Sequence, residues 1–278
     1  MKPLHHLRSR LALICLGMAV LPAAAVEETG KSDIWDKVRK SLFDDRPIST
    51  DAEQIIQLET PARAEDAATV PIAIKTRAPQ TAAHYVKKIY LLIDKNPSPI
   101  AAIFTLTPDS GRADIETRVR IEEYTDIRAV AEMNDGKLFM AKRYIKASGG
   151  CSAPAGKDLD AALASVGRMK LRLDGDVTPN EPVLAQLMIS HPNLSGLAKD
   201  QVTHLYTPAY FVRKIDVSYA GRPVLSAEVD FSISENPNFR FYFVPRGDGE
   251  LKADVVDSKD LTFETKLMVK TAQAGAAR

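Results

Sequence analysis

The sequence predicts an all-β protein: two β-sandwich domains in tandem, joined by a short helical linker and preceded by a signal peptide. Two groups of short segments carry strand-like apolar patterns, separated by turns rich in proline, glycine and asparagine. A stretch of small residues without periodicity lies between the groups, and an apolar run lies near the N-terminus. Short strands at this spacing are typical of β-sandwiches, so each group predicts one sandwich.

Residues 1–25 have the features of an export signal. Basic residues come first, an apolar run from Leu11 to Leu21 follows, and the segment ends in Ala23-Ala24-Ala25. The run is too short to span a bilayer well, and small residues at the last and third-last positions suit signal cleavage. We therefore expect a mature protein that begins at Val26, a periplasmic location and no membrane-embedded segment after cleavage.

The first domain is expected over residues 32–150. An apolar stripe with helical spacing predicts a short helix over 32–43, in which Trp35 is a packing anchor. After this helix the pattern changes to alternating apolar and polar residues, which is typical of half-buried strands. Strands are predicted over 55–58, 70–75, 86–93, 101–106, 115–121, 126–133 and 137–145.

The second domain is expected over residues 168–270. A flexible segment over 146–157 comes before it, and a linker helix over 158–167 follows that segment, with Asp158 as its N-cap. The last residues, 271–278, are expected to be disordered. Strands are predicted over 169–173, 183–189, 210–219, 224–233, 239–244, 251–256 and 261–269.

The charge balance argues against a nucleic-acid partner. The chain has 37 Lys and Arg against 36 Asp and Glu, and the signal segment carries basic residues but no acidic ones. The mature chain therefore has no basic surplus with which to neutralise phosphates. Short charge runs, such as Glu122-Glu123, are typical of solvated surface.

The cysteine count draws attention to one residue. The sequence has two cysteines, and Cys15 lies in the signal segment, so the mature chain keeps only Cys151. A single cysteine in an exported protein is either a reactive thiol or half of an intermolecular bridge.

The residues around Cys151 predict an exposed nucleophile on a flexible arm. Gly149 and Gly150 precede it, and Ser152 and Gly156 are among the small residues that follow. Glycine lets the backbone bend and leaves little bulk beside the sulfur. The alternative is a buried cysteine that acts as a small apolar residue, which is the more common state of a lone cysteine. Such a cysteine would belong to an apolar periodic stretch, and this segment has none, so the context favours function.

Other chemistries have weaker support in the sequence. The remaining histidines of the mature chain are His84, His191 and His204, and no C-x-x-C or H-x-x-x-H motif occurs. We therefore expect no metal site. A Cys–His pair would need a base from the second domain, for which His191 is the accessory candidate; we interpret the other two as turn or surface residues. Phosphate-binding loops, nucleotide-binding glycine motifs and the G-x-S-x-G elbow are missing, so no cofactor is expected.

Several segments together resemble a known family. The run Lys-Ala-Ser-Gly-Gly-Cys-Ser over 146–152 resembles the end of SoxY, the subunit of the Sox thiosulfate-oxidation carrier that binds sulfur compounds, and residues 61–71 resemble its early strands. The second half resembles the partner subunit SoxZ in the runs ISHPNLSG, PAYF and SISENP, which are residues 189–196, 208–211 and 232–237.

The resemblance implies immunoglobulin-like β-sandwiches and a carrier without autonomous catalysis. Cys151 would hold a sulfur-containing cargo covalently while periplasmic redox enzymes, of the cytochrome c or quinoprotein dehydrogenase type, act on it. In the family the cysteine stands at a free C-terminus, whereas this chain continues into the second domain. It therefore resembles the fused SoxYZ-like carriers associated with quinoprotein dehydrogenases.

Two other functions stay open at this point. The chain could be a non-catalytic accessory or binding protein of a quinoprotein dehydrogenase system. It would then act through its sandwich surfaces, and Cys151 would be incidental or would bridge two chains. It could also be a thiol-redox enzyme, but the lack of a C-x-x-C motif counts against that interpretation.

Overall fold

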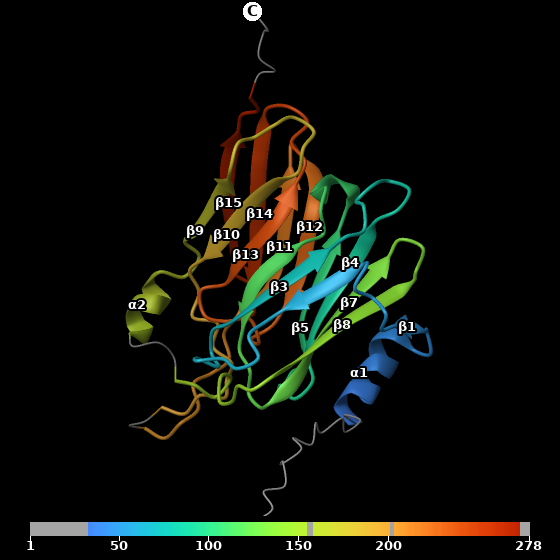
Figure 1. Ribbon diagram of the computed structural model, residues 1–278. Helices are drawn as coiled ribbons and strands as arrows, with labels where there is room; N and C mark the ends of the chain where they lie inside the picture. Colours follow the sequence, from blue (N-terminus) through green and yellow to red (C-terminus); the bar gives the residue numbers. More distant parts are fainter. Residues whose placement is uncertain (1–32, 155–157, 201–202, 273–278) are drawn as a thin grey trace, which may run out of the picture. The chain divides into compact units, whose positions relative to one another are not determined.

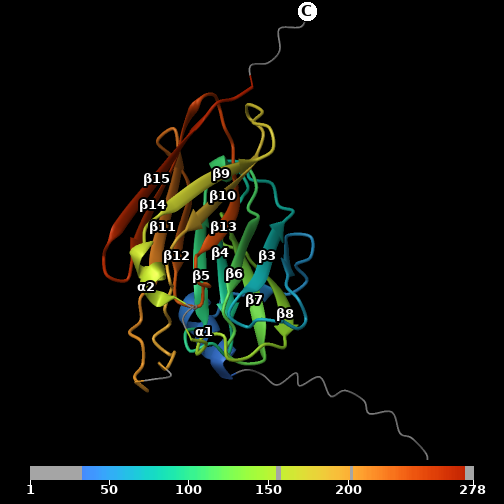
Figure 2. The same cartoon turned by 90° about the vertical axis from the view of Figure 1, so that its left-hand side faces the viewer.

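The computed structural model describes residues 33–154, 158–200 and 203–272, and its strands form two layers (Figure 1, and Figure 2 after a turn of 90°). One layer is a nine-stranded sheet of order β1-β8-β7-β4-β5-β12-β11-β14-β15. The other is a six-stranded sheet of order β2-β3-β6-β13-β10-β9. The predicted signal peptide, residues 1–25, lies outside the described residues. Among the described residues, no helix is both long and apolar enough to cross a membrane.

Within the described residues, the first half of the chain supplies eight strands and one α-helix. Helix α1 (Asp33–Phe43) has Asp33 and Asp36 in its first turn and Lys40 in its last, which suits the helix dipole. The strands are β1 (Ile48–Ser49), β2 (Ile56–Glu59), β3 (Val70–Thr76), β4 (Val86–Ile93), β5 (Ile100–Leu106), β6 (Ile115–Val119), β7 (Thr125–Met133) and β8 (Leu138–Ile145).

Helix α1 covers the outer face of the nine-stranded sheet in this half. Phe43 from the helix packs edge-to-face on Tyr90 of β4, with ring centroids 4.8 Å apart. Leu92, Val130 and other apolar residues complete this small second core. Strands β4 and β7 are therefore buried over much of both faces, and the buried outer face of β7 includes the charged Arg128, while most other strands alternate between buried and exposed residues.

The second half supplies seven strands and the linker helix. Helix α2 (Leu159–Ala164) begins at its predicted N-cap, where the Asp158 carboxylate accepts from the Ala161 N–H. The strands are β9 (Met169–Asp174), β10 (Val183–Ile189), β11 (Val212–Tyr219), β12 (Arg222–Val229), β13 (Asn238–Phe243), β14 (Gly249–Asp257) and β15 (Thr262–Val269). Each predicted strand in both halves coincides with an observed one, whereas β1 and a short 3-10 helix, Pro108–Ser110, were not predicted.

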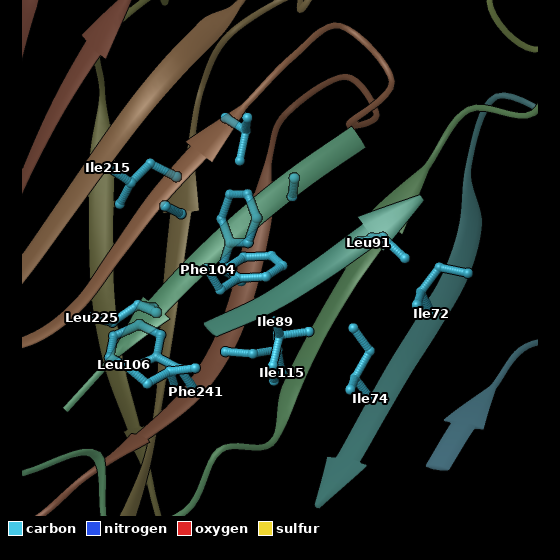
Figure 3. Packing of buried hydrophobic residues seen from close by; sticks show 14 of the residues in the cluster. Ile72, Ile74, Ile89, Leu91, Phe104, Leu106, Ile115, Ile215, Leu225 and Phe241 are labelled. Carbon is cyan, nitrogen blue, oxygen red and sulfur yellow. The ribbon is translucent and has the colours of Figure 1, made fainter. Parts of the chain in front are cut away.

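The two sandwiches join directly, through pairs of strands that we call the seam. Strand β5 pairs antiparallel with β12 in one sheet, and β6 pairs antiparallel with β13 in the other. Both sheets therefore run through the two halves. A single apolar core lies between them: Figure 3 shows Phe104 and Leu106 from the first half beside Leu225 and Phe241 from the second. The immunoglobulin-like sandwiches predicted from the sequence thus share one interior.

The seam continues past the last paired residues of β6 and β13. The Arg120 N–H donates to the Ser232 carbonyl (2.7 Å), and the Ser234 N–H donates to the Arg118 carbonyl (3.0 Å). Val119 also forms an isolated antiparallel bridge with Ile233. This end of the seam positions the segment that contains Cys151.

Candidate functional site

Cys151 lies in a turn between β8 and α2, which we define as the carrier turn, residues 149–152. The turn packs through its backbone on the segment that directly follows β6. The Gly149 N–H donates to the carbonyl of Glu122 (2.8 Å). The next N–H, from Gly150, donates to the carbonyl of Ile121 (2.8 Å). The turn is thus held in register against the seam, and the thiol faces inward.

Gly150 is needed here for space rather than for flexibility. A Cβ atom on this residue would lie 2.0 Å from the Ala67 carbonyl oxygen and 2.8 Å from the Ile121 carbonyl oxygen. Both obstacles are backbone atoms, and they cannot move aside without breaking the hydrogen bond from the Ile121 N–H to the Ala67 carbonyl (2.8 Å). Gly149 has a φ of +80°, the left-handed region that favours glycine. The sequence interpretation of these glycines as a flexible arm is therefore wrong for the described part of the segment.

The Glu122 carboxylate makes three hydrogen bonds to the carrier turn. It accepts from the backbone N–H of Cys151 (2.9 Å), from the backbone N–H of Ser152 (3.0 Å) and from the Ser152 hydroxyl (2.8 Å). Hydrogen bonds to a charged acceptor are about twice as strong as neutral ones. The interpretation of Glu122-Glu123 as plain solvated surface is therefore wrong for Glu122, which is half-buried, and right for Glu123, which is exposed.

The second half of the chain holds the same turn from the other side. The buried Ser195 hydroxyl donates to the Cys151 carbonyl. The buried Arg120 guanidinium joins the two halves, because it donates to the Gly150 carbonyl (3.3 Å) and to the Asn193 carbonyl (3.4 Å). The site is therefore a composite of both sandwiches.

The structure buries the thiol that the sequence predicted to be exposed. Cys151 has 0 % of its surface exposed, and burial, helped by the negative charge of Glu122, raises its pKa to about 12. The Arg120 guanidinium acts in the opposite direction but does not outweigh burial. In this closed arrangement the thiol is protonated at neutral pH and has little nucleophilic character. Of the other predicted arm residues, Ser152 is exposed and Gly156 lies outside the described residues.

Two charged neighbours complete the surroundings of the thiol. Burial lowers the pKa of Arg120, and one of its nitrogens, Nε, is buried without a hydrogen-bond partner. Burial also raises the pKa of Asp230, to about 6, and its Oδ2 atom likewise lacks a partner. The Asp230 carboxylate adds to the rise in the pKa of Cys151.

His191 lies close to this site in the fold, but its ring faces another group. Its Nδ1 atom accepts from the Asn193 N–H (3.0 Å), and its Nε2 atom lies 3.8 Å from Oδ2 of Asp257. The ring packs edge-to-face on Tyr210, with centroids 4.5 Å apart. Burial lowers the pKa of His191 to about 4, against the opposing influence of Asp257. The Nδ1 lone pair is thus occupied, so His191 acts as a structural residue that fixes the loop beside the carrier turn.

The remaining candidates do not join the site. His84 and His204 are exposed, as expected for surface residues. Within the described ranges, no three side chains of His, Cys, Asp or Glu come together as a metal site. The functional residues that the sequence reasoning missed are Arg120, Glu122 and Ser195. Ser195 was inside one of the runs that resemble SoxZ, which was the available signal for it.

The fold and the site define a tandem β-sandwich protein with a cysteine-bearing turn at the junction. The family model described as "Sulfur oxidation protein SoxY" matches residues 39–151. The model described as "Sulphur oxidation protein SoxZ" matches residues 171–268. The chain therefore belongs to the SoxYZ-like sulfur carriers, as a fusion of a SoxY domain and a SoxZ domain.

Comparison with solved structures finds the following similarities. The sulfur carrier protein SoxY from Chlorobium limicola f thiosulfatophilum is 26 % identical and covers 41 % of this chain and 91 % of its own, with a TM-score of 0.35. A superoxide reductase from Ignicoccus hospitalis is 17 % identical and covers 34 % of this chain and 79 % of its own, with a TM-score of 0.31. The fibronectin(III)-like modules of CbhA from Clostridium thermocellum are 15 % identical and cover 81 % of this chain and 98 % of theirs, with a TM-score of 0.22. No curated protein matches the chain.

Proposed function

We propose that this protein is a periplasmic carrier that holds a sulfur-containing species covalently on Cys151 and presents it to partner redox enzymes. The observation that carries the proposal is the position of the thiol. The SoxY match ends at Cys151 itself, directly after the two glycines of the carrier turn. Cys151 is also the one cysteine within the described residues, and it is a free thiol.

The attachment chemistry can be written as a balanced step. Cys151 and a cargo with its own S–H group form one S–S bond, and both S–H bonds break. Two protons are released, and two electrons pass to the partner redox enzyme, for which we propose the cytochrome c or quinoprotein dehydrogenase type. Exchange with a cargo that already contains an S–S bond needs no oxidant, because the leaving sulfur departs with the electron pair and takes the proton.

The surroundings of the thiol support carriage rather than autonomous catalysis. A catalytic cysteine needs a base within hydrogen-bond reach. The Nδ1 atom of His191 is occupied by the Asn193 N–H, and the Glu122 carboxylate is occupied by the turn's own donors. We therefore propose that the partner enzymes supply the reaction, and that this protein supplies the attachment point.

One observation favours the alternative function. A fully buried thiol also suits a packed core residue in an accessory protein that works through its sandwich surfaces. On that alternative, Cys151 needs no cargo, and substitution of Cys151 leaves the function intact.

Intact-mass measurement of the protein isolated from the periplasm separates the two functions. A carrier shows added mass that a reductant removes, and Cys151→Ser shows none under the same growth conditions. Cys151→Ser should also fail to complement a deletion strain. If the wild-type protein carries no added mass and Cys151→Ser complements fully, the carrier function is wrong and the accessory function takes its place.

A further inference from the structure

The closed carrier turn raises the question of how a buried thiol becomes available. We propose that Glu122 and Ser195 are positioning residues for Cys151, which help to hold the carrier turn closed, and that a local opening of the turn, in which these two contacts are released, exposes the thiol. We call the pair the Glu122–Ser195 latch. The proposal rests on the carrier function proposed above and adds the way in which access to the thiol is controlled.

Glu122 has the properties of a reversible contact. All three of its hydrogen bonds go to Cys151 or Ser152, so its side chain serves the turn and nothing else that the structure describes. Its own backbone is fixed, because its N–H donates to Oδ1 of Asn96 (2.9 Å). The carboxylate is only half-buried and Ser152 is exposed, so water can replace these bonds when the turn opens.

Ser195, from the second sandwich, contacts the turn on its other side. Its hydroxyl donates to the Cys151 carbonyl, and its oxygen accepts from the Leu197 N–H (3.1 Å). The carrier turn therefore lies between one contact from each half of the fused chain. Besides the latch, the Gly149 and Gly150 N–H groups and the Arg120 guanidinium hold the turn. The turn therefore opens when a small number of hydrogen bonds break.

Release of the latch would change the chemistry of the thiol as well as its exposure. The groups that act on the Cys151 thiol are Glu122, Arg120 and Asp230, and burial is the largest influence on its pKa. When the turn opens, burial ends and the distance from the Glu122 carboxylate grows, so the pKa falls towards its ordinary value of 9.0. The fraction of reactive thiolate at neutral pH rises about tenfold for each unit by which the pKa falls.

A closed turn also suits a thiol that must survive between loading events. Exposed thiolates are oxidised more readily than buried thiols, to sulfenic acid and beyond. In this chain the turn is tethered on both sides, since β8 precedes it and α2 follows it. Access therefore requires a local opening of residues 149–152, not the swing of a free chain end.

The rate of thiol labelling tests the latch directly. The full-length protein is mixed with 5,5′-dithiobis(2-nitrobenzoic acid) at pH 7, and the labelling rate is measured for the wild type and for Glu122→Ala, Glu122→Gln and Ser195→Ala. We expect labelling to be about tenfold faster or more for Glu122→Ala, which loses three hydrogen bonds to a carboxylate, and severalfold faster for Ser195→Ala, which loses one bond from a hydroxyl, because each loss of about 1.4 kcal/mol in the closed state is tenfold in the open population. Glu122→Gln keeps an acceptor oxygen without the charge, so its labelling rate should lie between those of the wild type and Glu122→Ala. The matched control is Glu123→Ala, next to Glu122 but exposed, which should label at the wild-type rate.

A second measurement separates local opening from general loss of stability. Labelling through local opening depends little on low concentrations of urea, whereas labelling through global unfolding accelerates with the urea dependence of the whole protein. Wild-type labelling rates in Glu122→Ala and Ser195→Ala overturn the proposal, as does acceleration that follows global unfolding alone. The probe replaces the cargo in this experiment, so its outcome is independent of the mass measurement that tests the carrier function.

Discussion

Two polar clusters lie side by side at the end of the seam, and they are held in different ways. In one, His191 and Asp257 have fully buried side chains, enclosed with Tyr210 in the second sandwich. In the other, the carrier turn is held by the half-buried Glu122 and by Ser195, together with its own backbone N–H groups and Arg120. Asn193 joins the clusters, since its N–H donates to His191 and its carbonyl accepts from Arg120.

The difference separates a fixed support from a releasable element. Opening the His191 cluster would expose the apolar residues packed around it, at a cost of several kcal/mol. Opening the carrier turn exchanges its hydrogen bonds with water and exposes one small buried side chain, Cys151, so its net cost is smaller. A carrier needs both properties: a rigid platform that positions the thiol and a short segment that can leave it.

The largest expected effect comes from Gly150→Val. A side chain here collides with the Ala67 and Ile121 carbonyls, so we expect a loss of about 4 kcal/mol or more in the free energy of unfolding, or failure to fold. Urea unfolding measures the loss. The control is Gly136→Ala, where a Cβ meets nothing within 4 Å and only the φ of +86° is unfavourable, at about 1 kcal/mol. Equal stability of the two variants would contradict the close packing of the turn.

The second effect is a pH dependence of stability that originates at His191. Its pKa in the folded protein is about 4, below the ordinary value of 6.5, so the unfolded chain binds more protons between these values. The contribution to stability is complete above pH 6.5 and is lost as the pH falls towards 4, by up to about 3 kcal/mol.

Urea unfolding of the wild type and His191→Gln at a series of pH values measures this contribution. Asp230 acts in the opposite direction, because its raised pKa of about 6 stabilises the folded state at low pH, and this stabilisation is lost as the pH rises through 6. Its influence is the same in both proteins, so the difference between them isolates His191. If the free energy of unfolding of His191→Gln depends on pH as steeply as that of the wild type, His191 is not a buried, neutral group.

The smallest effect on stability is expected from Cys151→Ser and Cys151→Ala. The serine variant buries a hydroxyl in place of a thiol and should lose about 1 kcal/mol, and the alanine variant should lose a similar amount through a small cavity. Thermal unfolding measures both losses, and the same samples should carry no reductant-sensitive added mass. A loss of several kcal/mol in both variants would mean that Cys151 is a core residue. The carrier turn would then be a fixed element, like the His191 cluster, and not a releasable one.

The positions of the strands could be predicted from the sequence because strand periodicity is a local property. Strand β4 was predicted with its observed bounds, Val86–Ile93, and β10 was predicted with Val183–Ile189. Strand β1 was missed because it has two residues, too few to show any alternation. The Asp158 cap of α2 was also predictable, since a cap acts on the first turn of its own helix.

The candidate site could be predicted only in part. Cys151 was identified because its lone occurrence and its small neighbours are visible in the sequence. Its burial was not visible, because no apolar period surrounds it. A run of small residues is typical of flexible loops, but it is equally suited to a turn that packs on backbone, as Gly150 does on Ala67.

The sequence by itself determined the tandem of two sandwiches, the linker helix and the single thiol between them. These features follow from residue period, turn residues and composition, which act over a few positions. Only the tertiary structure decided that the thiol is buried, and that Glu122 and Ser195 bond to the turn that contains it. These residues lie 29 and 44 positions from Cys151 in the chain, and they meet it because β6 and β13 pair across the seam. Contacts over such separations depend on sheet register and strand order, which the local pattern of any one segment does not contain.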